Sequence, residues 1–354
     1  MNDQNQAENI EVLLKEKKLY KPSAAFAKAA RIKSFGAQKA LLSRARKSPE
    51  KFWAEAAKSL AWAKPWKKIL DWNPPFAKWF VGGRLNASVN CLDRHLAGPR
   101  RHKAAIVWEA ESGRTRTLTY AQLHQEVCRC ANALKSLGVK KGDRVGIYMP
   151  MVPEAAVAML ACARLGAAHN VVFAGFSAQA LAERLADSQA KVLITADGVS
   201  RKGEVISLKK TADEALSAAP NVTAALVLKH AGNEVAWTEG RDVWWREALA
   251  EESDVCPAEA FDSEQPLFIL YTSGSTGKPK GVLHTTGGYL TQAALTTRLV
   301  FDLRDEDLYW CTADVGWVTG HSYVVYGPLA EGATVLMYEG APLYPAPDRF
   351  WSIV

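Results

Sequence analysis

The 354-residue sequence has an ordinary globular composition, with 48% hydrophobic and 23% charged residues and a formal net charge of +7. A chain of this length supports a large buried core and more than one lobe. The most apolar stretch, residues 155–176, is interrupted by Arg164, His169 and Asn170, which argues against a membrane-spanning helix. The first residues resemble neither a signal peptide nor an Arg-rich transit sequence, so we expect a cytoplasmic protein without membrane contact.

The positive charge is concentrated near the start of the chain, where residues 1–70 contain 16 Lys and Arg against 6 Asp and Glu. These cations are interspersed with Ala, Leu and Trp, without a basic block or an aromatic stacking motif. A solvated helical surface is therefore favoured over nucleic-acid binding. The six cysteines show no CxxC spacing, which argues against a disulfide framework or a zinc site. We expect Cys128 and Cys130 to be two small residues on a helix.

The pattern of apolar residues changes twice along the chain. A helical spacing extends to about Lys68, and residues 71–86 form a connector rich in turn formers and aromatics that we expect to pack on a larger body. Beyond it, short apolar runs alternate with helical ones. Strands are predicted at 144–149, 169–173 and 191–195, and helices at 155–165, opened by Pro153, and at 178–186. Strands without polar alternation, separated by such helices, indicate an α/β fold with a parallel sheet covered on both faces.

The last third of the chain contains a glycine-rich loop. After a loose stretch at 231–262 without strong periodicity, residues 266–271 are typical of a buried strand, and residues 286–299 are predicted as a helix. The loop lies between them. Strand, glycine loop and helix in this order form the arrangement in which phosphates are usually held.

The residue types of this loop suit a polyphosphate. Glycines let backbone N–H groups turn toward an anion, hydroxyls donate to phosphate oxygens, and lysines supply counter-charge. The loop is not a Walker A motif, because Thr272 replaces the required glycine and Pro279 follows Lys278. A flexible connector is the alternative, but the two lysines and the buried strand upstream favour a functional loop. The predicted phosphate-binding residues are Thr272, Ser273, Gly274, Ser275, Thr276, Gly277, Lys278 and Lys280.

Residues 271–282 resemble the signature loop of the adenylate-forming superfamily, which includes acyl-CoA synthetases, luciferases and peptide-synthetase adenylation domains. Stretches along nearly the whole chain are similar to AMP-forming acetyl-CoA synthetases: 85–95, 148–164, 240–245, 282–290 and 310–329. The resemblance implies the layered sheets and flanking helices of the large N-terminal domain of these enzymes, in truncated form. We expect a helical extension and connector at 1–90, an incomplete AMP-binding domain at 91–354, and no small C-terminal domain.

The resemblance implies that acetate is joined to coenzyme A (CoA) through an acetyl-adenylate. The acetate carboxylate attacks the α-phosphate of ATP, pyrophosphate leaves, and the CoA thiol then displaces AMP, with ATP, CoA and Mg²⁺ as the implied cofactors. The adenylation lysine of the family lies beyond residue 354, so no catalytic residue or metal ligand is assigned. The isolated chain is expected to be an inactive fragment, and its oligomeric state stays open. Alternatives are a synthetase for propionate or another short acid, and a non-catalytic nucleotide-binding module.

In the family, the Val-Thr pair of a Gly-Trp-Val-Thr-Gly-His stretch borders the acyl pocket and the approach of the CoA thiol. Here the pair is Val318 and Thr319. A β-branched wall near the carboxylate favours acetate, although one methylene is worth only about 1–3 kcal/mol of discrimination. Core packing explains Trp317 equally well. His321 is expected to be structural, because adenylation removes no proton from a carboxylate.

The resemblance also implies where the nucleotide end of CoA lies, with an adenine platform at 173–175 and a phosphate-contacting arginine at 201. Two positions depart from the family: Glu204 stands where many members have arginine, and Leu343 where many have asparagine. Because a carboxylate repels a phosphate, either Lys202 supplies the charge or the CoA contacts differ. The predicted CoA-binding residues are Phe173, Ala174, Gly175, Arg201, Lys202, Gly203, Glu204, Thr319 and Leu343.

Overall fold

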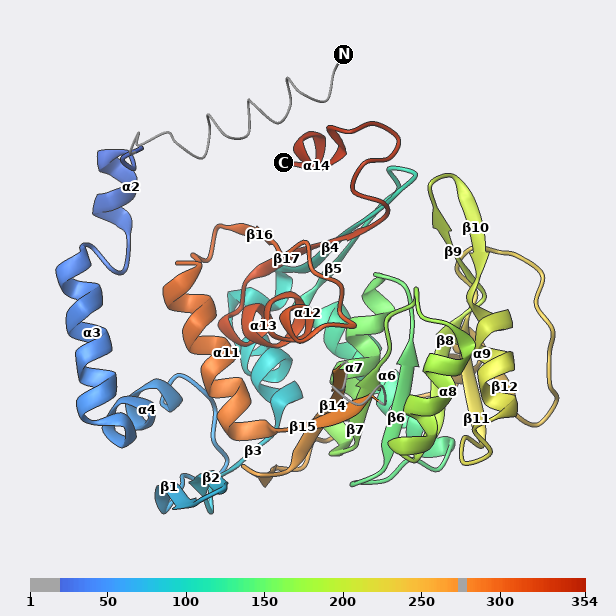
Figure 1. The fold of residues 1–354 in the computed structure, drawn as a ribbon, viewed down its shortest axis with the longest axis horizontal. Coiled ribbons are helices and arrows are strands. Elements are labelled where there is room, and N and C mark those ends of the chain that lie inside the picture. Colours follow the sequence, from blue (N-terminus) through green and yellow to red (C-terminus); the bar gives the residue numbers. More distant parts are fainter. Residues whose placement is uncertain (1–19, 273–278) are drawn as a thin grey trace. The chain divides into compact units, whose positions relative to one another are not determined.

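The computed structural model describes residues 20–272 and 279–354 and divides the chain into two compact units (Figure 1). The first unit extends to Lys47 and contains helices α2 (Ala24–Ala29) and α3 (Phe35–Lys47). Ser23 caps α2, because its hydroxyl accepts a hydrogen bond of 3.2 Å from the backbone N–H of Phe26. Neither helix contains a buried residue, so this unit is the solvated helical surface that the sequence predicts.

The second unit, Ser48–Val354, begins with helix α4 (Pro49–Ala57). The helical spacing predicted up to Lys68 is therefore confirmed only as far as Ala57. Beyond Ala57, Trp62 and Trp66 pack on Phe80 with ring centroids 5.3 and 5.1 Å away. These tertiary aromatic contacts, rather than helical periodicity, decide the conformation of the segment.

The predicted connector is an antiparallel hairpin of β1 (Lys68–Asn73) and β2 (Phe76–Val81), followed by the short strand β3 (Arg84–Leu85). It is attached to the larger body as expected. Strand β3 pairs with β13 (Phe261–Asp262), and the backbone N–H of Trp79 donates to Glu264 at 2.8 Å.

The main sheet of the described residues has seven strands in the order β12-β11-β8-β6-β7-β14-β15. All neighbouring pairs are parallel except β14 and β15. The predicted strands near 144–149, 169–173, 191–195 and 266–271 are thus confirmed, and so is the parallel sheet. The strands are β6 (Arg144–Tyr148), β7 (Ala168–Val171), β8 (Ala190–Ala196), β11 (Ala224–Leu228), β12 (Asp242–Trp244), β14 (Pro266–Thr272) and β15 (Lys280–Thr285).

Helices cover both faces of this sheet (Figure 1). Helix α7 (Pro153–Leu165) leads from β6 to β7, and α8 (Ala178–Asp187) leads back across β6 to β8. Because right-handed crossovers in opposite directions place their helices on opposite faces, α7 and α8 lie on different sides of the sheet. Helix α6 (Tyr120–Ser136), which contains Cys128 and Cys130 as predicted, packs on α7, and α9 (Leu208–Ser217) packs on α8.

A second sheet has the order β16-β17-β4-β5, with β5 (Thr115–Thr119) antiparallel to β4 (Ala104–Ala110). Strands β16 (Leu308–Trp310) and β17 (Thr334–Glu339) run parallel to β4. The indole N–H of Trp108 on β4 donates to the backbone oxygen of Met151, which follows β6, at 2.9 Å. This bond connects the two sheets near the carboxyl ends of their parallel strands.

Two predictions about the last third need correction. Strand β15 separates the glycine loop from the predicted helix, which is α11 (Thr286–Val300), so the loop connects two antiparallel strands and does not open a helix. The physical reason is that residues 280–285 find backbone partners along β14. In the stretch predicted as loose, residues 242–244 form β12 and residues 245–250 form the helix α10 (Trp245–Ala250).

The remaining elements are short connections. They are η1 (Val89–Asp93), α5 (Arg94–Leu96), η2 (Pro99–His102), β9 (Gly198–Arg201), β10 (Glu204–Ser207), α12 (Val318–Gly320), η3 (His321–Tyr326), α13 (Gly327–Glu331) and α14 (Arg349–Ile353). In the part of the chain that the structure describes, no helix has both the length and the apolar character needed to cross a membrane.

Candidate functional site

A cavity of about 720 Å³, which we call the central cavity, lies where parallel strands of both sheets end. Its walls include residues at or just after the carboxyl ends of β6, β7, β8, β16 and β17. In the main sheet, the connection after β6 leads to β7 on one side, whereas the connection after β8 leads to β11 on the other side. Such a switch point, at the carboxyl ends of parallel strands, is where α/β folds usually bind ligands.

One wall of the central cavity is the turn after β7, which contains the predicted CoA residues Phe173, Ala174 and Gly175. The Tyr148 hydroxyl holds this turn through hydrogen bonds to the backbone oxygens of Ala174 at 2.8 Å and Phe176 at 2.9 Å. Burial raises the pKa of Tyr148 to about 12, so the hydroxyl stays protonated as a donor. A Cβ at position 175 would meet the Phe173 ring at 2.5 Å, so a larger residue there would displace this ring from its present position.

Three aromatic rings gather at this turn. Phe173 and Phe176 meet edge to face with centroids 5.7 Å apart, and Trp317 lies 6.0 Å from Phe173. The side chain of Trp317 is 49% exposed. Core packing therefore does not explain this tryptophan, and its ring is available at the surface beside the central cavity.

Arg201 lines the opposite part of the cavity at the end of β9. It faces Glu204 across the hairpin of β9 and β10, and Lys202 and Gly203 form the turn with φ angles of +55° and +78°. Positive φ at both turn residues is typical of tight hairpins. The structure thus brings Arg201 into the cavity wall, with Lys202, Gly203 and Glu204 at the tip of an exposed hairpin.

A buried carboxylate, Glu111, fixes this hairpin. Its two oxygens accept hydrogen bonds from the backbone N–H groups of Gly203 at 3.0 Å and Ala341 at 2.8 Å. Burial acts to raise the pKa of Glu111, but these N–H donors outweigh it, so the pKa lies below its usual value. Glu111 thereby joins the hairpin to the segment of Leu343, whose side chain is exposed.

Asp314 is a cavity residue that the sequence predictions missed. Its carboxylate accepts a hydrogen bond of 2.7 Å from the backbone N–H of Gly316. Burial raises the pKa of Asp314, against the effects of this hydrogen bond and of the Arg201 charge. The sequence feature that could have indicated Asp314 is its position as a single acidic residue in the turn-forming stretch just before Trp317.

The predicted acyl-pocket residues lie at a second cavity of about 630 Å³, which we call the acyl cavity. Val318 and Thr319 line it together with His284 on β15 and Tyr289 on α11. Val318 is about half exposed, so it is not a core residue. Trp317 contacts the Phe173 ring of the central cavity and Val318 follows directly, so the segment 317–319 adjoins both cavities.

His321 is enclosed below this segment. Its side chain is fully buried, and burial lowers its pKa to about 3. Its Nδ1 lies 3.1 Å from the backbone oxygen of Trp317, which requires a proton on that nitrogen. A neutral, inaccessible imidazole of this kind agrees with the structural role expected from the sequence.

Only two of the predicted phosphate-binding residues lie within the described part of the chain. Thr272 ends β14 and Lys280 begins β15, and the two are opposite each other in the antiparallel register. Ser273, Gly274, Ser275, Thr276, Gly277 and Lys278 are outside the described residues. Upstream of Thr272, the Tyr271 hydroxyl donates to Asp187 at 2.6 Å and fixes the end of β14.

Among the residues described, no group of three or more His, Cys, Asp and Glu side chains is placed to hold a metal ion. Magnesium is commonly held by only one or two carboxylates together with substrate phosphates, so these residues offer no dedicated cage of protein ligands for it.

Comparison with protein families matches residues 92–354 to the family described as AMP-binding enzyme, and residues 38–91 to the acetyl-coenzyme A synthetase N-terminus. The chain belongs to the AMP-binding enzyme family. This match spans both sheets, the central cavity and most of the acyl cavity, so the family assignment and the architecture agree.

Among the similar relatives, the acetyl-coenzyme A synthetase of Deinococcus radiodurans is 54% identical over 351 residues, which cover 98% of this chain and 54% of that protein. The acetyl-coenzyme A synthetase of Streptomyces coelicolor is 56% identical over 349 residues, covering 98% of this chain and 53% of the relative. Acetyl-coenzyme A synthetase 2 of Pseudomonas putida is 57% identical over 309 residues, with 86% and 48% covered. The chain thus spans about half the length of the curated relatives it matches.

Proposed function

We propose that the full-length protein joins acetate to CoA at the expense of ATP, through an acetyl-adenylate intermediate. The observation that carries the proposal is that residues 317–319 adjoin both cavities: Trp317 contacts Phe173 of the central cavity, and Val318 and Thr319 line the acyl cavity. A synthetase of this type must bring a small carboxylate and a large thiol ligand together at one point. The names of the relatives, all acetyl-coenzyme A synthetases, support acetate as the carboxylate.

Adenylation brings the acetate carboxylate onto the α-phosphate of ATP, so two anions approach each other. Much of the barrier is electrostatic, and cations and hydrogen-bond donors near the phosphates lower it. We assign this role to Lys280 and the hydroxyl of Thr272, together with Ser273, Gly274, Ser275, Thr276, Gly277 and Lys278. The described side chains do not build a metal site, so we expect Mg²⁺ to be held mainly by phosphate oxygens.

For the second step we assign the central cavity to the nucleotide end of CoA. The exposed aromatic surface around Phe173 suits an adenine ring, and Arg201 suits a phosphate. Glu204 faces Arg201 across the hairpin and weakens the local positive potential, while the adjacent Lys202 compensates for it. Leu343 has an exposed side chain, and we expect it to contribute apolar contact rather than a hydrogen bond.

The proposal is tested by acetate-dependent exchange of pyrophosphate into ATP, measured on the full-length protein, followed by CoA-dependent release of AMP. Replacing Lys280 with Ala is expected to lower the exchange rate at least about tenfold, because a charge-assisted contact is worth about 1.5–3 kcal/mol. Lys67, an exposed lysine just before β1, provides the matched Lys→Ala control. Exchange that does not depend on acetate, or that is equal in the two variants, would refute the assignment.

A further inference from the structure

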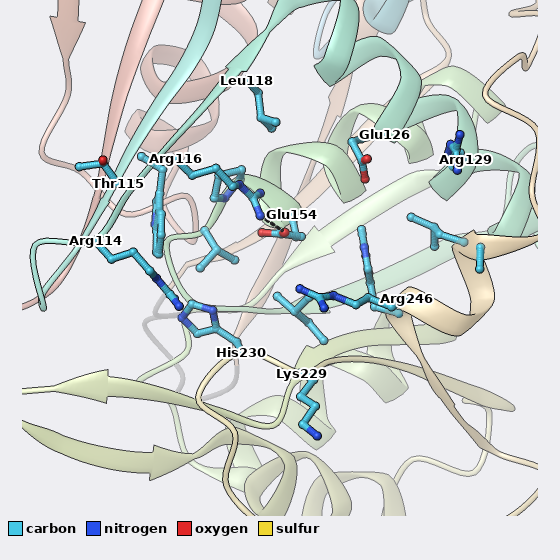
Figure 2. A pocket seen from close by; sticks show the side chains of 17 residues that line it. Arg114, Thr115, Arg116, Leu118, Glu126, Arg129, Glu154, Lys229, His230 and Arg246 are labelled. Atoms are coloured by element: carbon cyan, nitrogen blue, oxygen red, sulfur yellow. Dashed lines mark hydrogen bonds and ion pairs between the residues drawn. The ribbon is translucent and has the colours of Figure 1, made fainter.

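A third cavity, of about 630 Å³, lies outside the central and acyl cavities, and we call it the basic cavity (Figure 2). It is bordered by β5, by helices α6 and α10, by the start of α7 and by the residues after β11. None of the residues assigned above to ATP, CoA or acetate lines it. Its position over the carboxyl ends of β6 and β11 is one that α/β folds use for ligands.

Cations dominate the walls of the basic cavity. Five basic side chains line it, against two carboxylates, which leaves an excess of three positive charges. The basic residues are Arg114, Arg116, Arg129, Lys229 and Arg246, and the acidic ones are Glu126 and Glu154. This excess lies outside the N-terminal segment that carries the basic surplus of the sequence, so it is a local property of the cavity.

Strand periodicity places two of these cations together. Alternate residues of a strand share a face, so Arg114 and Arg116 project from the same side of the β4–β5 hairpin as Trp108, which pairs with Arg116. The Arg114 guanidinium lies over the Trp108 ring, 5.4 Å from its centroid. Since the Trp108 indole is itself anchored to Met151, this stacking fixes Arg114 while leaving its N–H donors available.

Only one of the five cations has a carboxylate partner among the described residues. Arg116 forms an ion pair with Glu154 at 2.7 Å. Figure 2 shows Arg116 and Arg246 extending into the cavity from different walls, with Arg114 beside His230. In this view Arg129 and Lys229 lie at the margins, whereas Arg114 and Arg246 point toward the same space as Arg116. An anion between these three guanidinium groups would relieve their mutual repulsion.

We propose that the basic cavity binds a small anion that carries a diphosphate group. Guanidinium groups match phosphate geometry through paired N–H donors, and several converging arginines favour a ligand that concentrates negative charge in a small volume. The Trp108 ring is covered by Arg114, and both Trp108 and Trp245 are buried, so the cavity has no open aromatic face for a nucleobase. The recognised group is therefore the diphosphate itself.

The basic cavity is separate from the proposed CoA site. His230 lines the basic cavity, Glu339 lines the central cavity, and His230 Nε2 lies 2.7 Å from the Glu339 carboxylate. This pair forms part of the partition between the two cavities. Binding at the basic cavity is thus a distinct event, which does not depend on the function proposed for the central cavity.

The test uses inorganic pyrophosphate as the probe and isothermal titration calorimetry as the measurement. Because the glycine loop and Arg201 also bind phosphate in our proposals, all titrations use the full-length protein with Lys278→Ala, Lys280→Ala and Arg201→Ala. We expect binding that weakens at least about tenfold on adding Arg246→Glu, since charge-assisted contacts are worth about 1.5–3 kcal/mol each. Arg114→Glu should have a similar effect, and added salt should weaken the binding.

The matched control is Arg101→Glu, because Arg101 is an exposed arginine of η2 that does not line the basic cavity. Circular dichroism and thermal unfolding show which variants retain the fold, and where a glutamate variant does not, Arg246→Gln and Arg114→Gln replace it. Absence of pyrophosphate binding, or equal weakening by Arg101→Glu, overturns the proposal. Binding of citrate as tight as that of pyrophosphate overturns the assignment of a diphosphate.

Discussion

At the scale of single residues, Val318 is the side chain best placed to select the acid. It lines the acyl cavity and is half exposed, so its methyl groups occupy space that a substrate can reach. Thr319 follows it on the side from which a CoA thiol would approach in our proposal. A β-branched residue at this point limits the length of the acyl chain without requiring any charged group.

We predict that Val318→Ala shifts the preference of the full-length protein from acetate toward propionate. The lost methyl groups leave room for one more methylene, which is worth about 1–3 kcal/mol in a fitted pocket, so the propionate-to-acetate ratio of kcat/KM should rise about tenfold or more. Steady-state kinetics with both acids provide the measurement. Val300→Ala is the control, because Val300 is 70% exposed on α11 and does not line the acyl cavity. An unchanged ratio would remove Val318 from the acyl pocket.

At the scale of elements, the β9–β10 hairpin is a small unit that depends on one turn and one carboxylate. Gly203 has a φ of +78°, and a Cβ at this position would meet the Tyr344 hydroxyl at 2.6 Å. Its backbone N–H is also held by Glu111. The hairpin positions Arg201 in the wall of the central cavity, so a distorted turn should displace the Arg201 side chain.

We predict that Gly203→Ala lowers the free energy of unfolding by about 1–3 kcal/mol and raises the KM for CoA severalfold. Left-handed backbone costs an L-residue about 1–2 kcal/mol, and the contact with Tyr344 adds to that cost. Urea unfolding and CoA titrations give the two quantities. Gly240→Ala is the matched control, since Gly240 has a φ of +79° but nothing within 4 Å of its virtual Cβ. If both variants changed the KM for CoA equally, the hairpin would have no special role at the CoA site.

The elements that the sequence predicts correctly are those with strong local signals. The strands β6, β7 and β8 are continuous apolar runs, and Pro153 marks the start of α7, so composition alone indicates them. Strand β15 was missed because it is mostly exposed and exists through its pairing with β14. Strand β12 is only three residues long, and its parallel pairing with β11 is a tertiary contact that no local pattern reports.

The same distinction applies to the site. Phe173 and Arg201 were named from a resemblance. The structure brings them to one cavity because Phe173 follows β7 and Arg201 ends β9, which follows β8, and both β7 and β8 pair with β6 in the main sheet. The basic cavity draws on residues spread from 108 to 250, and only folding places them together. Glu111 has no distinguishing sequence signal, since its partners are the backbone groups of Gly203 and Ala341. Hydrogen bonds between segments so far apart in the sequence form only when whole sheets pack together, so a local sequence pattern cannot predict them.

At the scale of the whole molecule, a partly buried ionic group joins three separate segments. Asp93 of η1 forms two hydrogen bonds with Arg164 of α7, at 2.8 and 2.9 Å, and lies 3.4 Å from His124 of α6. Cys128 also contacts His124, with its Sγ 3.6 Å from Nε2 and 3.9 Å from Nδ1, but this thiol is fully buried. A thiol without access to a substrate cannot act as a nucleophile, so we interpret the group as structural rather than as a catalytic triad.

This group predicts a pH dependence of stability. Hydrogen bonds with Asp93 and then Cys128 raise the pKa of His124 from 6.5 to about 9, against the effect of burial. The protonated form stabilises the fold, so its contribution is complete below about pH 6.5 and is lost as the pH rises through about 9. We expect a loss on the order of 1–3 kcal/mol across this window.

Urea unfolding at pH 6, 7.5 and 9.5 measures this loss. His124→Gln should flatten the dependence, whereas His102→Gln, a change at an exposed histidine, should leave it intact. A slope that persists in His124→Gln would assign the pH dependence to other groups.

The second sheet has a consequence for the order in which the chain acquires structure during synthesis. Strand β4 pairs with β17, and Val107 lies opposite Leu336, roughly 230 residues later in the chain. This pairing can form only after Leu336 has been synthesised. At about 5–20 residues per second, a ribosome needs on the order of 10–50 seconds to supply that partner. During this interval the edge of the nascent β4–β5 hairpin that will face β17 has no strand partner and can pair with other chains.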